Sequence, residues 1–203
     1  QGGATVVAIL GLIARVEHEY IARLSDLREN VGPFGNHGNR SVGAVFGQRY
    51  GWERANWFAP EGVEPKDVWS FRRTNYFEHV GNECRRLREK VGVIDLTPFT
   101  KFEVTGPGAE GWLDSLVANK VPTKVGRIAL CHALTQRGGI RSEFTITKLA
   151  DHYYYVVSAG AAERYDSDFL QKKLPTDGSV TLRNITGSRG VFVLAGPRAR
   201  DVL

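Results

Sequence analysis

A short unit occurs twice in this chain, and the two copies lie ninety positions apart. Residues 102–113 align with residues 192–203 without a gap. Each copy predicts a half-buried strand, a Gly-Pro turn and a helix, because proline is favoured in the first turn of a helix. This repeat, with further strands between its copies, predicts an α+β domain of duplicated split β-α-β units. The identical pairs are Phe102/Phe192, Gly106/Gly196, Pro107/Pro197, Ala109/Ala199 and Leu113/Leu203.

The second copy stops at Leu203, inside its predicted helix. A short helix depends on burial against the rest of a fold. A complete domain would not normally end at such a point, so we expect this sequence to be a fragment, truncated at the C-terminus of its domain.

A three-stranded meander is predicted between the two copies. Alternating apolar residues indicate the strands, and the pair Gly138-Gly139 is expected to supply the positive φ angles of a tight hairpin turn. A second turn at residues 150–152 precedes the run with the strongest β propensity. The predicted strands are 127–134, 144–148 and 153–158, and a helix should follow over residues 159–172.

The middle strand of the meander should have one buried face and one polar face. Phe144 and Ile146 alternate with Glu143, and Thr145 and Thr147 continue the polar face. A carboxylate at such a position is most often simply solvated, so a functional role for Glu143 needs further support. Of the five histidines, His132 alone is expected to share a face with such a site.

The N-terminal part of the chain is less regular. Residues 4–14 predict a buried helix or strand, residues 15–30 an amphipathic helix, and residues 31–41 a loop. We therefore divide the chain into an uncertain N-terminal segment or linker, 1–42, and a main domain, 43–203.

The segments before the first strand–Gly-Pro–helix unit predict two further elements. Residues 42–58 suggest an irregular segment held by its aromatic side chains. Residues 76–91 predict a helix that Gly92 ends, with an apolar stripe that includes Cys84. In the strand that follows, Phe102 should be buried, and Lys101 should lie on the polar side.

Composition excludes several classes of protein. The net charge of +5 favours an anionic small ligand, but no basic block accompanies a nucleic-acid motif. Two cysteines far apart in sequence predict neither a disulfide framework nor a metal site. The apolar stretch near the N-terminus is too short to cross a membrane. Nucleotide-binding and metalloprotease motifs, such as GxGxxG, GxxxxGK[ST] and HExxH, are absent from the sequence. We expect no nucleic-acid or membrane partner.

Three segments, 50–58, 83–85 and 92–99, resemble dimethylglycine and sarcosine dehydrogenases. They are similar to the region where those enzymes pass from a flavin domain into a tetrahydrofolate-binding half. That half is in turn similar to the aminomethyltransferase of glycine cleavage, whose pattern also occurs at residues 126–127, 137–140 and 184–186. The resemblance covers about residues 42–203. It implies an aminomethyltransferase-like folate-binding fold with an antiparallel sheet.

The resemblance also implies a function and a site. In this family the flavin half oxidises an N-methyl amine, and the folate half captures the one-carbon unit as methylene-tetrahydrofolate. By motif match the catalytic carboxylate is Glu143, Phe99 lines the pterin site, and Ser158 is a hydrogen-bonding partner. We add His132 to the cofactor-binding residues. The aminomethyltransferases typically have Asp, Tyr and Asn where this chain has Glu143, Leu130 and Ser158.

The expected cofactors are tetrahydrofolate and, in the full-length protein but not on this chain, FAD. The expected partner is a flavin domain upstream in the same polypeptide, and the substrate is an N-methyl amine. The expected location is the cytoplasm, or the mitochondrial matrix of a eukaryote. Two alternatives remain open: a relative that transfers a methyl group directly to folate, and a folate-fold module without catalysis.

Overall fold

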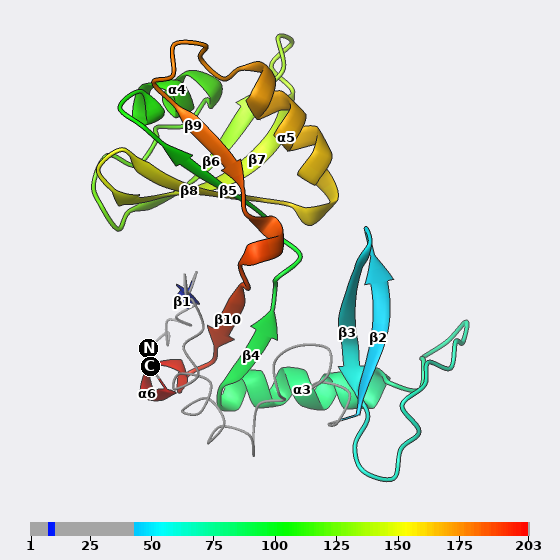
Figure 1. The fold of residues 1–203 in the computed structure, drawn as a ribbon. Helices are drawn as coiled ribbons and strands as arrows, with labels where there is room; N and C mark the ends of the chain where they lie inside the picture. Colours follow the sequence, from blue (N-terminus) through cyan, green and yellow to red (C-terminus); the bar gives the residue numbers. More distant parts are fainter. Residues whose placement is uncertain (1–7, 11–42, 203) are drawn as a thin grey trace. The chain divides into compact units, whose positions relative to one another are not determined.

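The computed structural model describes residues 8–10 and 43–202. These residues form two compact units, shown in Figure 1. Unit 1 holds the described residues up to Thr97 and those from Gly190 onward, and unit 2 is Pro98–Arg189. The chain therefore enters unit 2 once and leaves it once. The predicted boundary between residues 42 and 43 stays a prediction.

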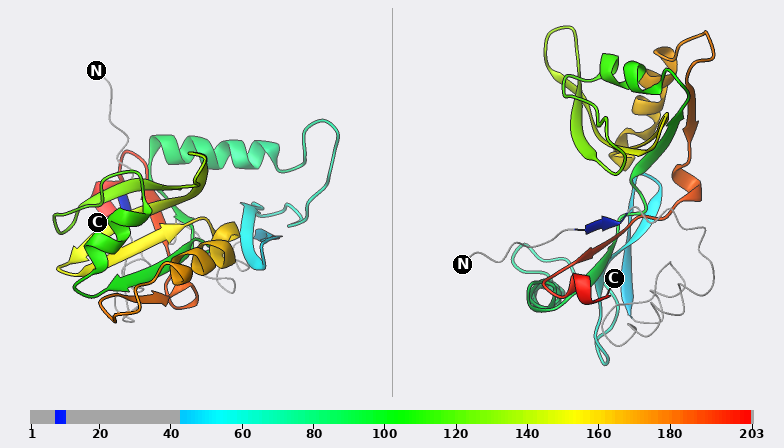
Figure 2. Two further views of the ribbon diagram at one scale, coloured as in Figure 1. Left: turned by 90° about the horizontal axis from the view of Figure 1, so that it is seen from above. Right: turned by 90° about the vertical axis from the view of Figure 1, so that its left-hand side faces the viewer.

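Unit 2 is built on a five-stranded antiparallel sheet with the strand order β6-β7-β8-β5-β9. Buried side chains from α4 and α5 belong to the same core cluster as those of the sheet, so both helices pack on one face. Figure 2 shows β5 and β9 side by side in both views. The elements are β5 (Thr100–Thr105), α4 (Ala109–Leu116), β6 (Ile128–Leu134), β7 (Ile140–Ala150), β8 (Tyr153–Ser158), the 3₁₀ turn η1 (Gly160–Ala162), α5 (Glu163–Lys172), β9 (Thr181–Asn184) and the 3₁₀ turn η2 (Thr186–Ser188).

The predicted meander is confirmed as β6, β7 and β8. Phe144 and Ile146 are buried in the core, and Glu143 is exposed on the other face, as their alternation predicts. One detail is wrong: only Gly138 of the glycine pair has a positive φ, 79°. The turn is a longer loop, in which the Thr135 N–H donates to the Gly139 carbonyl at 2.8 Å, so a single left-handed residue suffices.

Unit 1 holds a hairpin, a long helix and a three-stranded antiparallel sheet with the order β1-β10-β4. Strand β1 lies within residues 4–14, for which the sequence predicts either a helix or a strand. The described residues of that stretch form a strand. The predicted elements at residues 15–30 and 31–41 lie outside the described residues. The elements are β1 (Ala8–Leu10), β2 (Ala44–Arg49), β3 (Trp52–Phe58), α3 (Phe77–Glu89), β4 (Gly92–Asp95), β10 (Phe192–Ala195) and α6 (Ala199–Val202).

The prediction of an irregular segment at residues 42–58 is wrong. Strands β2 and β3 form an antiparallel hairpin, and Tyr50 and Gly51 turn the chain with φ angles of 54° and 84°. Two positive φ angles match the twist of adjacent strands, which explains this tight turn. Trp57 on β3 is fully buried, and its Nε1 donates to Asp67 Oδ1 at 2.8 Å.

Helix α3 has no fully buried side chain, although its sequence predicts an apolar stripe. Cys84, expected on that stripe, is exposed. The helix ends at Glu89, and Gly92 is the first residue of β4 instead of the helix stop. Within the described residues, no helix has the length and apolar character needed to cross a bilayer.

The prediction that Lys101 lies on an exposed polar side is also wrong. Its relative exposure is 0%, although it alternates with the buried residues Phe102 and Val104. β5 lies between β8 and β9, so its neighbours flank both of its edges. Alternation separates the two faces of β5 correctly, but it does not predict that Lys101, on the polar side, is buried as well.

The repeated strand–Gly-Pro–helix unit is confirmed, and it extends to a second strand. β5 pairs with β9, and β10 pairs with β4, in equivalent antiparallel registers. Thr105 lies opposite Thr181 in the first pair, and Ala195 opposite Gly92 in the second. The four opposed positions of the first pair match the four of the second, one for one.

The turn after each repeated strand is equivalent as well. Gly106 and Gly196 have φ angles of 116° and 123°, and a Cβ on either would lie 2.3 or 2.4 Å from a backbone oxygen. Those oxygens belong to Ser179 and Lys90, and each accepts a hydrogen bond at 3.0 Å from the residue two positions after the glycine. Both glycines are therefore required by a close backbone approach and not only by the turn.

A pair of side chains fastens the far end of each strand pair, and we call each pair a strand-end clamp. In unit 2, Asn184 Oδ1 accepts the N–H of Thr186 at 2.9 Å, and Thr186 Oγ1 accepts the N–H of Lys101 at 3.0 Å. In unit 1, Asp95 Oδ1 accepts the N–H of Thr97 at 2.8 Å, and Thr97 Oγ1 accepts the N–H of Val191 at 3.2 Å. A twofold relation between the two units themselves stays a prediction.

Candidate functional site

The face of the unit 2 sheet that does not pack on α4 and α5 is the candidate site, and we call it the outer face. Directly opposed residues of antiparallel strands project to the same side. The register therefore defines rows of side chains across the outer face. These rows are His132–Glu143, then Leu130–Thr145–Val157–Lys101, then Ile128–Thr147–Tyr155–Glu103–Arg183.

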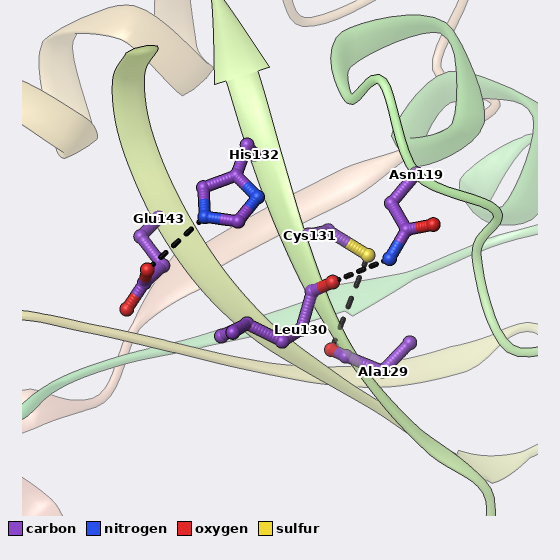
Figure 3. A network of polar contacts seen from close by, with 6 residues as sticks. All are labelled: Asn119, Ala129, Leu130, Cys131, His132 and Glu143. Carbon is purple, nitrogen blue, oxygen red and sulfur yellow. Dashed lines mark hydrogen bonds and ion pairs between the residues drawn. The ribbon is translucent and has the colours of Figure 1, made fainter.

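His132 and Glu143 form the polar contact at one end of this face. They are opposed on β6 and β7, and their side chains point toward one another in Figure 3. His132 Nε2 lies 3.1 Å from Glu143 Oε2. The side chains are 33% and 62% exposed, so both are accessible to a ligand in solution.

The backbone beneath this pair is held from the side as well. β6 is an edge strand of its sheet, and such edges carry unpaired backbone groups. Here Asn119 Nδ2 donates to the Leu130 carbonyl at 2.6 Å, and the Ala118 N–H donates to the His132 carbonyl at 2.9 Å (Figure 3 draws the first of these bonds). The position of His132 is therefore set by hydrogen bonds on both sides of its strand.

Apolar side chains flank the pair along β6. Ile128, Leu130 and Leu134 are 52%, 49% and 43% exposed, whereas Ala129, Cys131 and Ala133 face the core. Exposed aliphatic side chains beside a carboxylate suit a ligand that has a flat apolar surface and N–H groups at its edge. This part of the outer face can thus both pack against a ring and accept a proton from it.

The other end of the outer face is more buried and holds two tyrosines. Tyr153 donates to Glu103 Oε1 at 2.7 Å, and Arg183 lies 3.7 Å from the other oxygen of that carboxylate. Burial, then the hydrogen bond to Glu103, raises the pKa of Tyr153 to about 12. Burial also raises the pKa of Tyr155 to about 12. Both phenols therefore stay protonated near neutral pH and can serve as hydrogen-bond donors.

The structure does not bring all the predicted site residues together. Ser158 opposes Thr100 and shares the core face with Val156, so it lies on the opposite side of the sheet from Glu143. Its Oγ is buried and has no hydrogen-bond partner. Phe99 directly precedes β5 and is partly exposed. Glu143 and His132 are in contact, and the roles of all four residues stay predictions.

Sequence reasoning did not identify the buried end of this face. Glu103, Tyr153 and Arg183 come from three strands, and only the pairing of β5 with both β8 and β9 brings them together. Their period-2 spacing marks them as one face of their own strands, but it does not indicate which strands are neighbours. For metal ions, the described ranges 8–10 and 43–202 contain no cluster of three or more potential ligands.

Comparison with known proteins identifies the family. The family model described as the GCVT N-terminal domain matches residues 37–203, and the chain therefore belongs to this family. Rat mitochondrial dimethylglycine dehydrogenase is 39% identical over 154 residues, which are 75% of this chain and 18% of that protein. The mouse mitochondrial pyruvate dehydrogenase phosphatase regulatory subunit is 31% identical over 166 residues, covering 79% of this chain and 19% of that protein.

The fold is that of the aminomethyltransferases. A solved structure of the glycine cleavage system aminomethyltransferase T from Bartonella henselae matches with a TM-score of 0.64 and 20% identity. The match covers 88% of this chain and 41% of that structure. The fold and the resemblance to dimethylglycine dehydrogenases predicted from the sequence are both confirmed. The chain spans less than a fifth of the length of the rat enzyme.

Proposed function

We propose that this chain is the tetrahydrofolate-dependent one-carbon capture part of a flavin-linked N-methyl amine dehydrogenase. The observation that carries the proposal is Glu143, an exposed carboxylate on the outer face, beside exposed aliphatic side chains of β6. The family and the similarity to dimethylglycine dehydrogenase support the substrate class.

The outer face has the groups that this reaction requires. Folate, when bound, would supply the two nitrogens that take up the one-carbon unit. Leu130 and Ile128 offer an apolar surface to its ring, and Thr145 offers a hydroxyl in the neighbouring position. Glu143 would accept a proton from a folate nitrogen as that nitrogen forms its bond to carbon, and its position would orient the amine.

The proposal extends to the partners of the chain. FAD would be bound by another part of the same polypeptide, upstream of this chain, and the substrate would be a small N-methyl amine. We propose a cytoplasmic location or, in a eukaryote, the mitochondrial matrix. The second of these agrees with the word mitochondrial in the name of the rat relative.

The substitution Glu143→Gln in the full-length polypeptide tests the proposal. It keeps the size and the hydrogen-bonding capacity of the side chain but removes its ability to take a proton. Flavin reduction by the amine should stay nearly unchanged, and methylene-tetrahydrofolate formation should fall by about 10²–10⁴-fold, with formaldehyde released instead. Rapid-reaction flavin absorbance and product analysis with folate present measure the two steps.

Glu163→Gln is the matched control, because Glu163 lies on α5 and accepts a hydrogen bond from Asn184 that glutamine can also accept. It should leave both steps unchanged. An unchanged yield of methylene-tetrahydrofolate in Glu143→Gln would show that Glu143 is an ordinary surface residue and would contradict the proposal.

A second candidate is a folate-fold module without catalysis. The similarity to a protein named as a phosphatase regulatory subunit favours it. In that case the purified full-length polypeptide would not form methylene-tetrahydrofolate, and Glu143→Gln would change no activity. A chain that transfers a methyl group directly to folate would instead be active without flavin.

A further inference from the structure

The contact between His132 and Glu143 gives the carboxylate a partner that can itself carry a proton. We propose that the two side chains form a proton-holding dyad, in which His132 is a positioning residue that acts through Glu143. The inference rests on the proposed folate-dependent function and adds a residue to that site.

The geometry of the pair supports a shared proton. His132 and Glu143 are directly opposed in the register of β6 and β7, and His132 Nε2 lies 3.1 Å from Glu143 Oε2. A carboxylate only accepts hydrogen bonds, so the imidazole N–H donates in this contact. The other carboxylate oxygen, Oε1, has no bond to His132 and can face a ligand.

Hydrogen bonds on both edges of β6 hold the backbone of His132 in place. The Ala118 N–H donates to the His132 carbonyl on one edge of β6, and β7 pairs with the other edge. Two residues along the strand, Asn119 holds the Leu130 carbonyl in the same way. A strand fixed at both edges keeps the backbone of His132 in place, as a positioning residue requires.

The chemistry of the proposed reaction calls for a group that holds protons. A methylene iminium of the amine and reduced folate become methylene-folate and a protonated amine. Lone pairs on the two folate nitrogens form two nitrogen–carbon bonds, and the carbon–nitrogen electrons of the iminium return to the amine nitrogen. The two protons that the folate nitrogens lose are the two that the departing amine gains. Two protons must therefore leave the folate nitrogens, and two must reach the amine nitrogen.

The dyad can hold each proton between these transfers. Glu143 accepts the proton from folate on Oε1. The pair then holds it either on that carboxyl group or, after exchange through water, on Nδ1 of His132, while the Nε2–H of His132 stays donated to Oε2. The pair then returns the proton to the amine nitrogen as the amine leaves. An imidazole suits this task because its second ring nitrogen can take a proton while the first stays hydrogen-bonded. A lone carboxylate would hold the proton less well, so Glu143 benefits from its partner.

Two variants of His132 in the full-length polypeptide test the proposal. His132→Gln keeps a hydrogen bond to Glu143 but cannot take a proton, and His132→Ala leaves room for free imidazole. Both should form methylene-tetrahydrofolate about 10²-fold more slowly at saturating folate, with the folate Kd and flavin reduction unchanged. Added imidazole should raise the rate of His132→Ala about tenfold and should leave the rate of His132→Gln unchanged.

A second measurement does not depend on activity. In the NMR spectrum of the wild-type polypeptide, the His132 imidazole N–H should give a downfield proton signal because it donates to a carboxylate. The signal should be lost in Glu143→Ala. The control is His152→Asn, which removes an exposed imidazole at the turn between β7 and β8. Asparagine tolerates the φ of 57° at that position, so this variant should behave as wild type in every measurement.

The outcomes separate this inference from the function on which it rests. If Glu143→Gln stops folate-dependent capture while His132→Gln keeps the wild-type rate, the proposed function stands and the dyad is overturned. If His132→Gln is slow but imidazole does not restore His132→Ala, the histidine is only structural and the dyad is likewise overturned. If neither Glu143→Gln nor His132→Gln affects capture, the proposed function itself fails.

Discussion

The two copies of the strand pair, β5–β9 in unit 2 and β10–β4 in unit 1, share their register, their glycine turn and their strand-end clamp. They differ in what surrounds them. The copy in unit 2 is the edge of a five-stranded sheet that continues into the meander, whereas the copy in unit 1 is joined to the short strand β1. Of the candidate site, Glu143 and His132 lie on the meander and not on the repeated element.

This difference shows that the repeat serves as a scaffold. The copy in unit 2 belongs to a large core, to which Phe102 and Val104 contribute fully buried side chains. Its counterpart Phe192 is only partly buried. An identical backbone arrangement should therefore contribute more stability in unit 2 than in unit 1. Paired substitutions at equivalent positions can test this expectation.

The largest effect is expected from replacing the two turn glycines with alanine. Gly106→Ala places a Cβ 2.3 Å from the Ser179 carbonyl oxygen at a positive φ, and should cost about 2–4 kcal/mol of unfolding free energy. Gly196→Ala meets Lys90 in the same way but should have a smaller effect on the chain as a whole. Urea denaturation, with hydrogen exchange resolved by unit, measures both.

Gly111→Ala is the control for these variants. Gly111 lies within α4, and a Cβ there would meet no atom within 4 Å. Since alanine favours helix over glycine, this variant should be at least as stable as the wild type. Wild-type stability in Gly106→Ala would show that the close approach of the Ser179 carbonyl is not real.

A smaller effect is expected from removing the clamp hydroxyls. Thr186→Val leaves the buried Lys101 N–H without its acceptor, and should cost about 1–3 kcal/mol. Thr97→Val removes the equivalent acceptor from Val191 but should cost less, because Thr97 is partly exposed and water can replace it. Serine at either position keeps the hydroxyl and should retain most of the stability. Equal losses at the two positions would contradict the difference between the units.

The smallest effect is expected from exchanging the amide and carboxylate of the clamps. Asp95→Asn keeps the oxygen that accepts the Thr97 N–H, so its effect should stay within about 0.5 kcal/mol. Asn184→Asp keeps the equivalent acceptor but loses the bond that Nδ2 donates to Glu163 and brings two carboxylates together. It should cost slightly more, and the loss should shrink in high salt. A larger loss of unfolding free energy in Asp95→Asn than in Asn184→Asp would contradict the expected difference between the two units.

Local patterns predicted the elements that depend on neighbouring residues in sequence. β8 has the predicted bounds, and the faces of β7 follow its period-2 alternation around Glu143. The repeat is visible in the sequence because Gly106 and Gly196 are required by the same close backbone contact. These features have direct local causes, so a single sequence reveals them.

Features that depend on distant pairing were not predictable in this way. Lys101 is buried on the polar side of β5, and alternation along a central strand does not reveal what surrounds such a side chain. Ser158 was assigned to the site by resemblance, but its position in the register places it on the core face. The hairpin at β2–β3 was missed because aromatic residues lie on both of its faces, which obscures the period-2 pattern.

The order in which the chain passes through the two units bears on how it folds during synthesis. The two ends of unit 2 are adjacent, since the Lys101 N–H donates to Thr186 Oγ1. Unit 2 is thus complete once residue 189 has left the ribosome, whereas β4 must wait for β10, which is made about a hundred residues later. The entropic cost of closing a loop grows with its length. A folded unit 2 shortens the loop between β4 and β10 to a few residues. Folding of unit 2 therefore favours the pairing of β4 with β10 that completes unit 1.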